Sequence, residues 1–104
     1  MSARGLGDVY KRQQITSSYR FLERYAKVQK VDQLIFNMSR YLLELALVNY
    51  KMIKFRSSNL AASALYLSMK MTKSPSPWND TIAKHSQYKE FEVRPCAKEL
   101  FSLL

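Results

Sequence analysis

The chain has 104 residues, the size of a single domain. Seventeen Lys and Arg against eight Asp and Glu give a net charge of +9, which favours nucleic acid or an acidic protein as partner. A composition that is 47% hydrophobic and 24% charged is globular and excludes a disordered chain. Since no apolar run approaches the roughly 18 residues of a membrane span, we expect a soluble protein.

Cysteine and glycine are both scarce. The single cysteine, Cys96, excludes a disulfide within the chain. The two glycines, Gly5 and Gly7, lie near the N-terminus, so the rest of the chain lacks the residue on which hairpin turns and phosphate-binding loops depend. The sequence therefore predicts an all-α fold, with helices joined by short polar turns.

Residues 1–13 differ in character from the rest of the chain. They show no apolar periodicity, and they lack the apolar centre of a signal peptide. We expect them to lie outside the domain, as a candidate cloning or sequencing artefact. The domain itself is then expected over residues 14–104.

The first two helices are predicted from apolar residues three and four positions apart. Residues 17–28 form the first, with Thr16 or Ser17 as N-cap. Its apolar face contains Phe21, Leu22, Tyr25 and Val28. The second begins near Asp32, a natural N-cap, and ends near residues 49–50. It has the strongest periodicity in the chain, carried by Leu34, Ile35, Met38, Leu42, Leu45 and Val48.

An Ala- and Leu-rich stretch over residues 60–71 predicts a buried third helix at the centre of the fold. Its small residues allow other helices to approach closely. They are Ala61, Ala62, Ser63 and Ala64. A basic, aromatic connector over residues 51–56 precedes this helix, and Ser57 or Ser58 is the expected N-cap.

Two Ser-Pro pairs end the third helix. Ser76 is then the expected N-cap and Pro77 the first residue of a short fourth helix. This helix carries Trp78, Ile82 and His85. After a turn at residues 86–89, the fifth helix shows one apolar stripe, in which Pro95 is acceptable only within the first turn. The stripe contains Val93, Cys96, Ala97, Leu100, Phe101 and Leu104.

Residues that could carry chemistry are few. His85 and Cys96 are each the only residue of their kind, and no acidic residues cluster near them to complete a zinc site or a catalytic pair. We expect no enzymatic activity, no cofactor, no metal and no small-molecule ligand. The candidate site residues are instead structural core positions: Leu42, Leu45, Leu60, Ala61, Ala64, Leu65, Trp78, Cys96 and Leu100.

Ser74 and Ser76 each precede a proline, which is the minimal site of proline-directed kinases. They are therefore candidate phosphorylation sites, and a phosphate there would lie close in the chain to Lys70 and Lys73. The simpler interpretation, that the prolines only end a helix, is favoured.

Two blocks of sequence resemble the C-terminal cyclin box of A- and B-type mitotic cyclins. The first reads Tyr-Leu-Leu-Glu-Leu-Ala-Leu-Val-Asn-Tyr over residues 41–50 and Lys-Phe-Arg-Ser-Ser-Asn-Leu-Ala-Ala-Ser-Ala over residues 54–64. The second reads Pro-Trp-Asn-Asp-Thr over residues 77–81, Tyr-Lys-Glu over 88–90 and Val-Arg-Pro-Cys-Ala-Lys-Glu-Leu over 93–100. The likeness covers about residues 15–104.

The resemblance implies a five-helix cyclin-box fold, the second of two tandem boxes in the regulatory subunit of a cyclin-dependent kinase. Its implied partners are the N-terminal cyclin box of the same protein and the kinase, in the nucleus and cytoplasm of dividing cells. Most of the kinase contact in this family belongs to the first box, so this domain is expected to support a cyclin rather than to activate a kinase alone.

One alternative is a basic helical module that binds nucleic acid in transcription initiation. Its best residues are Lys51, Lys54 and Arg56, interleaved with Tyr50 and Phe55.

The sequence departs from the family pattern at two helix starts. Ser57 stands where the family usually has Pro before its central helix, which should loosen the connector. Lys89 stands where a Thr or Ser usually caps the last helix, and losing such a cap costs about 1 kcal/mol. Both departures suggest a divergent member.

Overall fold

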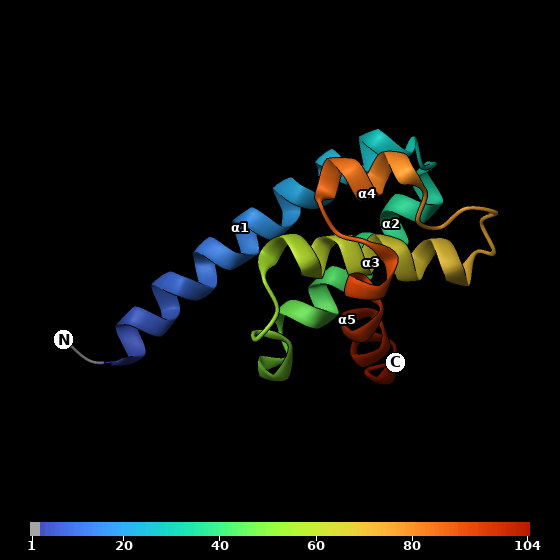
Figure 1. Cartoon of the computed structure of the whole chain (residues 1–104). Coiled ribbons are helices and arrows are strands. Elements are labelled where there is room, and N and C mark those ends of the chain that lie inside the picture. Colours follow the sequence, from blue (N-terminus) through green and yellow to red (C-terminus); the bar gives the residue numbers. More distant parts are fainter. Residues whose placement is uncertain (1–2) are drawn as a thin grey trace.

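The computed structural model describes the chain from residue 3 to residue 104, with side chains described from Thr16 onward. This part of the chain contains no strand (Figure 1). Its elements are α1 (Ala3–Gln29), α2 (Gln33–Leu47), the short 3-10 helix η1 (Tyr50–Met52), α3 (Ser57–Met71), α4 (Asp80–Ser86) and α5 (Glu90–Ser102). The predicted all-α fold with five α-helices is confirmed.

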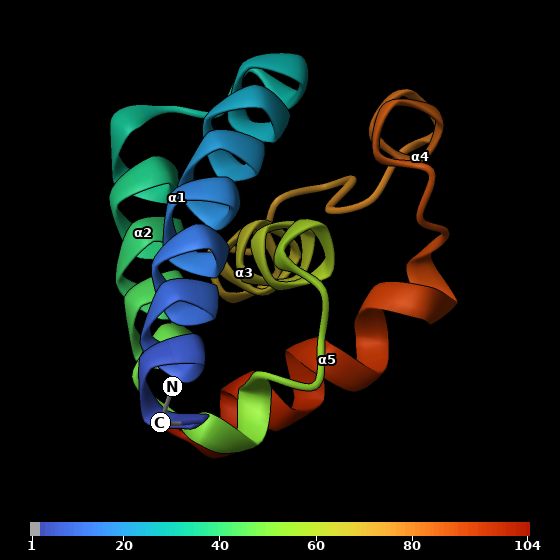
Figure 2. The ribbon, with the colours of Figure 1, turned by 90° about the vertical axis from the view of Figure 1, so that its left-hand side faces the viewer.

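Helix α3 lies at the centre of the molecule. Viewed nearly along its axis, it is surrounded by α1 and α2 on one side, α4 on the other and α5 below (Figure 2). It contacts α1, α2 and α5. Ten consecutive positions of α3, residues 60–69, are buried. The prediction of a central third helix is therefore confirmed.

Small side chains on α3 let its neighbours approach closely. On the side of α2, the hydroxyl groups of Ser39 and Ser68 share a hydrogen bond, and the hydroxyl that accepts in this bond can donate its own proton to a carbonyl of its own helix. On the side of α5, the Ser63 hydroxyl lies 3.2 Å from the carbonyl oxygen of Val93. A hydroxyl can reach another helix in this way only where no bulky side chain separates the two backbones.

Helix α1 begins earlier than predicted. It starts at Ala3 and runs unbroken to Gln29, so Thr16 and Ser17 lie inside the helix and the predicted N-cap there is wrong. The preceding residues contain no proline and are rich in Lys, Arg and Gln, which are good helix formers. The N-terminal part of α1 extends beyond the other helices (Figure 1).

Asp32 is the N-cap of α2, as predicted. Its carboxylate accepts a hydrogen bond of 2.9 Å from the Ile35 backbone N–H. The helix ends at Leu47, two residues before the expected region, and Asn49 then caps η1 with a bond from the Lys51 N–H. The connector predicted over residues 51–56 thus contains the end of a short helix.

The predicted N-caps of α3 and α4 are wrong. Arg56 occupies the N-cap position of α3 without a capping side-chain bond, while Ser58 is already inside the helix and shares a hydrogen bond with the Tyr88 hydroxyl. Helix α4 is capped by Asn79, whose side chain accepts a bond of 3.1 Å from the Ile82 N–H. Asn79 competes successfully with Ser76 because Trp78 is held outside the helix by tertiary contacts.

Helix α5 tolerates a proline deeper than predicted. Pro95 is the sixth residue of the helix, beyond its first turn. The carbonyl group that loses its partner belongs to Phe91, and both residues lie on the exposed side of the helix, where water can satisfy it. At the start of α5, the Lys89 ammonium cannot accept a hydrogen bond. The Glu92 carboxylate compensates in part by accepting a 3.0 Å bond from the Lys89 backbone N–H.

Two predicted apolar stripes are only partly buried. On α5, Val93, Cys96, Ala97 and Leu100 are buried, but Phe101 is exposed, as is Leu104 beyond the end of the helix. On α2, the buried set differs from the predicted apolar face, although Leu42 belongs to both and Ile35 is partly buried against the core. The buried residues are Ser39, Leu42, Leu43, Ala46 and Leu47.

Candidate protein-interaction surface

The exposed side of α2 carries a continuous apolar stripe, which we call the α2 stripe. It consists of Leu34, Met38, Tyr41, Leu45 and Val48. The exposed fractions are 64% for Leu34, 60% for Tyr41 and 75% for Val48. Met38 and Leu45, which lie between them, are half-buried.

The spacing of the α2 stripe is that of a helix interface. Its members follow one another at alternating steps of four and three residues, so they line one side of the helix as the seam residues of a coiled coil do. The opposite side of α2 packs on α3 and α1. Helix α2 is thus apolar on two sides and lies at one edge of the molecule (Figure 2). An unpartnered apolar helix face of this kind is typical of a protein contact surface.

The sequence periodicity predicts that much of the α2 stripe faces the core. Four of its five members belong to that predicted face, and Tyr41 does not. The signal was present, because Tyr41 occupies the seam position between Met38 and Leu45. A helix that has more apolar positions than one face can hold indicates a second contact surface.

The candidate core residues have two environments in the structure. Leu45 and Trp78 are half-buried. The others are buried, each with at most 2% of its surface exposed: Leu42, Leu60, Ala61, Ala64, Leu65, Cys96 and Leu100.

Trp78 joins three elements just before α4. Its indole N–H donates a 2.9 Å hydrogen bond to the carbonyl oxygen of Tyr88, and its ring meets the ring of Tyr66 edge-on at 5.9 Å. The Tyr66 hydroxyl in turn donates a 2.7 Å bond to the Glu90 carboxylate. This bond lowers the pKa of Glu90; partial burial opposes the shift, and the nearby Arg94 adds to it.

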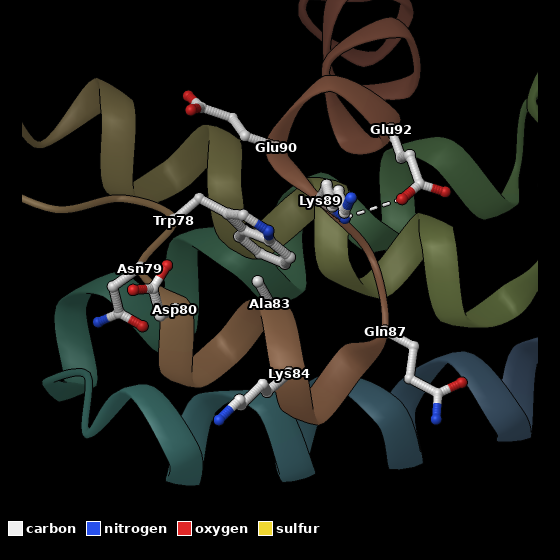
Figure 3. A pocket seen from close by; sticks show the side chains of 9 residues that line it. All are labelled: Trp78, Asn79, Asp80, Ala83, Lys84, Gln87, Lys89, Glu90 and Glu92. Carbon is white, nitrogen blue, oxygen red and sulfur yellow. Dashed lines mark hydrogen bonds between the residues drawn. The ribbon is translucent and has the colours of Figure 1, made fainter.

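A pocket of about 750 Å³ opens beside Trp78, between α4 and the start of α5. Its charged groups do not form a catalytic arrangement, because the carboxylates of Asp80, Glu90 and Glu92 point in different directions and do not converge (Figure 3). The Glu92 carboxylate already accepts a hydrogen bond from the backbone N–H of Lys89. The pocket therefore shows no geometry for acid–base chemistry.

The structure places Cys96 in the core and His85 on the surface. Burial raises the pKa of the Cys96 thiol to about 11, so at neutral pH it is a protonated core side chain rather than a nucleophile. The His85 ring meets the Tyr25 ring edge-on at 6.4 Å, which is an aromatic packing contact. Among the residues described, no three His, Cys, Asp or Glu side chains form a group that could hold a metal ion.

The basic connector is partly engaged within the fold. The Lys54 ammonium pairs with the Glu99 carboxylate at 2.9 Å and lies 5.3 Å from the centre of the Phe55 ring. Lys51, Arg56 and Tyr50 are exposed. In the described part of the chain, no helix is long and apolar enough to cross a membrane.

Comparison with known proteins agrees with this fold. Residues 16–104 match the family model described as cyclin, C-terminal domain. The chain is 37% identical over 87 residues to the G2/mitotic-specific cyclin-B of Dictyostelium discoideum, covering 83% of this chain and 20% of the relative. It is 38% identical over 84 residues to the G2/mitotic-specific cyclin-B of Patella vulgata, covering 81% and 20%.

A plant relative gives the same result. Cyclin-B1-2 of Arabidopsis thaliana is 38% identical over 87 residues, which cover 83% of this chain and 19% of the relative. The chain thus spans about a fifth of the length of these relatives. Cyclin domains are regulatory rather than catalytic, in agreement with the prediction of a non-enzyme. The chain belongs to the cyclin family, as a C-terminal cyclin domain related to the mitotic B-type cyclins.

Proposed function

We propose that this chain acts as the C-terminal domain of a cyclin that regulates a cyclin-dependent kinase in mitosis, in the nucleus and cytoplasm. The family match and the G2/mitotic names of its relatives support this proposal. Within it, residues 14–104 form the cyclin domain and the N-terminal cyclin box of the same protein is the direct partner. The kinase is contacted mainly through that box.

The exposed α2 stripe is the observation that carries the proposal of a partner domain. A face lined by Leu34, Tyr41 and Val48 is costly to leave in water, and covering each such side chain contributes about 1.5–3 kcal/mol. Its alternating spacing of four and three residues suits a helix of the partner. A tandem cyclin box supplies helices and is required by the proposed function, so we assign the α2 stripe to it.

The test is reconstitution from two pieces. The chain is co-expressed with the N-terminal box of a related B-type cyclin and a cyclin-dependent kinase, and complex formation and kinase activity are measured. We expect a ternary complex whose activity exceeds that of kinase and N-terminal box alone. Tyr41→Ala should weaken assembly by about 2 kcal/mol, roughly thirtyfold in Kd, because aromatic residues at the centre of an interface contribute most.

Phe91→Ala is the matched control. Phe91 is an aromatic residue on α5 with 66% of its surface exposed, so it resembles Tyr41 in size and exposure but lies outside the α2 stripe. Both variants should unfold at the same temperature as the parent chain. Equal loss of assembly in the two variants would contradict the assignment of the stripe, and no assembly by the parent chain would contradict the cyclin function itself.

The same preparation tests the nucleic-acid alternative. Binding through the exposed basic residues would weaken by about 0.9 log units per released counterion for each tenfold rise in salt. We expect no such steep dependence, because the pairing of Lys54 with Glu99 leaves Lys51 and Arg56 as the two basic residues of this connector for phosphate contacts.

A further inference from the structure

We propose that Ser76 is a phosphorylation site for a proline-directed serine/threonine kinase, and that the fold protects the neighbouring Ser74 from the same enzyme. Both residues lie in the loop between α3 and α4, and both precede a proline. Sequence alone does not distinguish Ser74 from Ser76. The geometry of the loop distinguishes them, and this argument does not depend on the cyclin function proposed above.

Ser74 belongs to a closed turn that ends α3. Its backbone N–H donates a 2.9 Å bond to the carbonyl of Met69, and the N–H of Lys73 donates a 3.0 Å bond to that of Lys70. This pair of bonds is the Schellman motif, and Lys73 takes the left-handed conformation that the motif requires, with φ of 58°. The hydroxyl groups of Ser74 and Thr72 lie 3.3 Å apart. Extending the chain around Ser74 would therefore break two backbone hydrogen bonds.

Ser76 lies beyond this turn and is exposed, as is Pro75 before it. The ring of Pro77 disfavours helical backbone at Ser76 and so favours an extended conformation there. Among the described residues, none forms a hydrogen bond with the Ser76 hydroxyl. Exposed Ser76 and half-buried Pro77 both lie outside the closed turn, so this Ser-Pro pair can enter a kinase cleft without any rearrangement of α3.

The reaction is an ordinary phosphoryl transfer with ATP as co-reactant. The Oγ atom of Ser76 attacks the γ-phosphorus of ATP, a new O–P bond forms, and the bond from that phosphorus to the ADP oxygen breaks. The hydroxyl proton passes to the catalytic aspartate of the kinase. The product carries a charge of about −1.5 to −2, three residues from Lys73.

The fold confines the effect of this charge to the surface. Trp78, two residues further along, is anchored by its bond to the Tyr88 carbonyl and by its contact with Tyr66. The phosphate would therefore add a negative group to a chain of net charge +9 without displacing the core. Such a group is suited to a partner protein that presents Arg or Lys side chains.

The experiment treats the folded full chain with a purified proline-directed kinase and Mg-ATP, and locates phosphate by mass spectrometry over time. We expect modification of Ser76 about tenfold faster than of Ser74, or more, because two backbone bonds protect Ser74. Ser76→Ala should lose most of the incorporation, and Ser74→Ala should keep it. Pro77→Ala should also lose most of the phosphate incorporation, because it keeps the Ser76 hydroxyl but removes the proline that a proline-directed kinase requires.

A synthetic peptide of residues 70–81 provides the unfolded control. In the peptide the closed turn is absent, so Ser74 and Ser76 should be modified at rates within a few-fold of each other. Equal modification of both residues in the folded chain would overturn the proposal. Absence of modification in the folded chain would also overturn the proposal, because Ser76 would then be inaccessible or not a substrate. This conclusion holds whether or not the peptide is modified. Circular dichroism checks that each variant is folded.

Discussion

Tyr66 connects the buried central helix with the surface of α5. Its side chain is buried, with 2% of its surface exposed, but its hydroxyl reaches the Glu90 carboxylate at 2.7 Å. Above the ring, the Lys70 ammonium lies 5.4 Å from its centre. A single residue thus satisfies its own polar group, supports Trp78 and orients the first residue of α5.

We predict that Tyr66→Phe lowers the free energy of unfolding by about 1 kcal/mol at pH 7. Glu90 binds its proton more weakly in the folded chain than in the unfolded chain, since its pKa is lowered from the ordinary 4.5. Its contribution to stability is therefore complete above that value and is lost as the pH falls below it. The difference between the parent chain and the variant should shrink below about pH 4 in urea titrations.

Glu90→Gln is the control for this experiment. It keeps the size of the side chain but removes the titration, so its stability relative to the parent chain should change over the same acid range. A difference between Tyr66→Phe and the parent chain that stays constant from pH 7 to low pH would contradict the role assigned to the Tyr66–Glu90 bond.

At the scale of the elements, the starts of the helices depend on both local chemistry and tertiary contacts. Asp32 is the predicted N-cap of α2, and it caps that helix in the structure. Before α4, both Ser76 and Asn79 are good cap residues, and Asn79 is the one used. Trp78 decides between them, because a helix that began at Pro77 would include it and move its ring away from Tyr66 and the Tyr88 carbonyl.

We predict that Asn79→Ala destabilises the protein by about 1 kcal/mol, since it removes the bond to the Ile82 N–H. Ser76→Ala should change the free energy of unfolding by less than about 0.5 kcal/mol, because Ser76 caps no helix in the structure. Urea unfolding of the two variants measures both values. A larger loss in Ser76→Ala than in Asn79→Ala would show that α4 starts earlier than the structure has it.

At the scale of the whole molecule, the two halves of α1 lie in different surroundings. Its C-terminal half packs on α3 and α4 through buried residues, among them Ser18, Leu22 and Tyr25. Its N-terminal half projects beyond the body (Figure 1). The family match begins at residue 16, and the domain boundary we propose lies at residue 14.

We predict that deletion of residues 1–13 changes the free energy of unfolding by less than about 0.5 kcal/mol. Thermal unfolding followed by circular dichroism measures this value. Deletion of residues 1–20 is the matched comparison, since it also removes buried Ser18 and half-buried Tyr19, and it should cost more than about 1 kcal/mol. A loss of more than about 1 kcal/mol in the shorter deletion would place the domain boundary before residue 14.

Several properties of the fold depend on local sequence alone. The absence of glycine after Gly7 disfavours hairpins and favours helices. The small residues of α3 specify a helix that others can approach on several sides, and the structure places α2 and α5 against it through Ser68 and Ser63. The cap at Asp32 depends only on residues within one turn. These features depend on residues close together in the chain or on side-chain size. Both properties can be read directly from the sequence.

Tertiary packing decided the rest. Helix α2 has two apolar sides, and periodicity detects apolar positions without showing which side meets the core. Docking of α3, which meets α2 at Ser39, buried the side that carries Leu43 and left Leu34, Tyr41 and Val48 in water. In the same way, packing of Trp78 on Tyr66 selected Asn79 over Ser76 as a cap. Each choice depends on contacts between residues far apart in the chain, which no local pattern specifies.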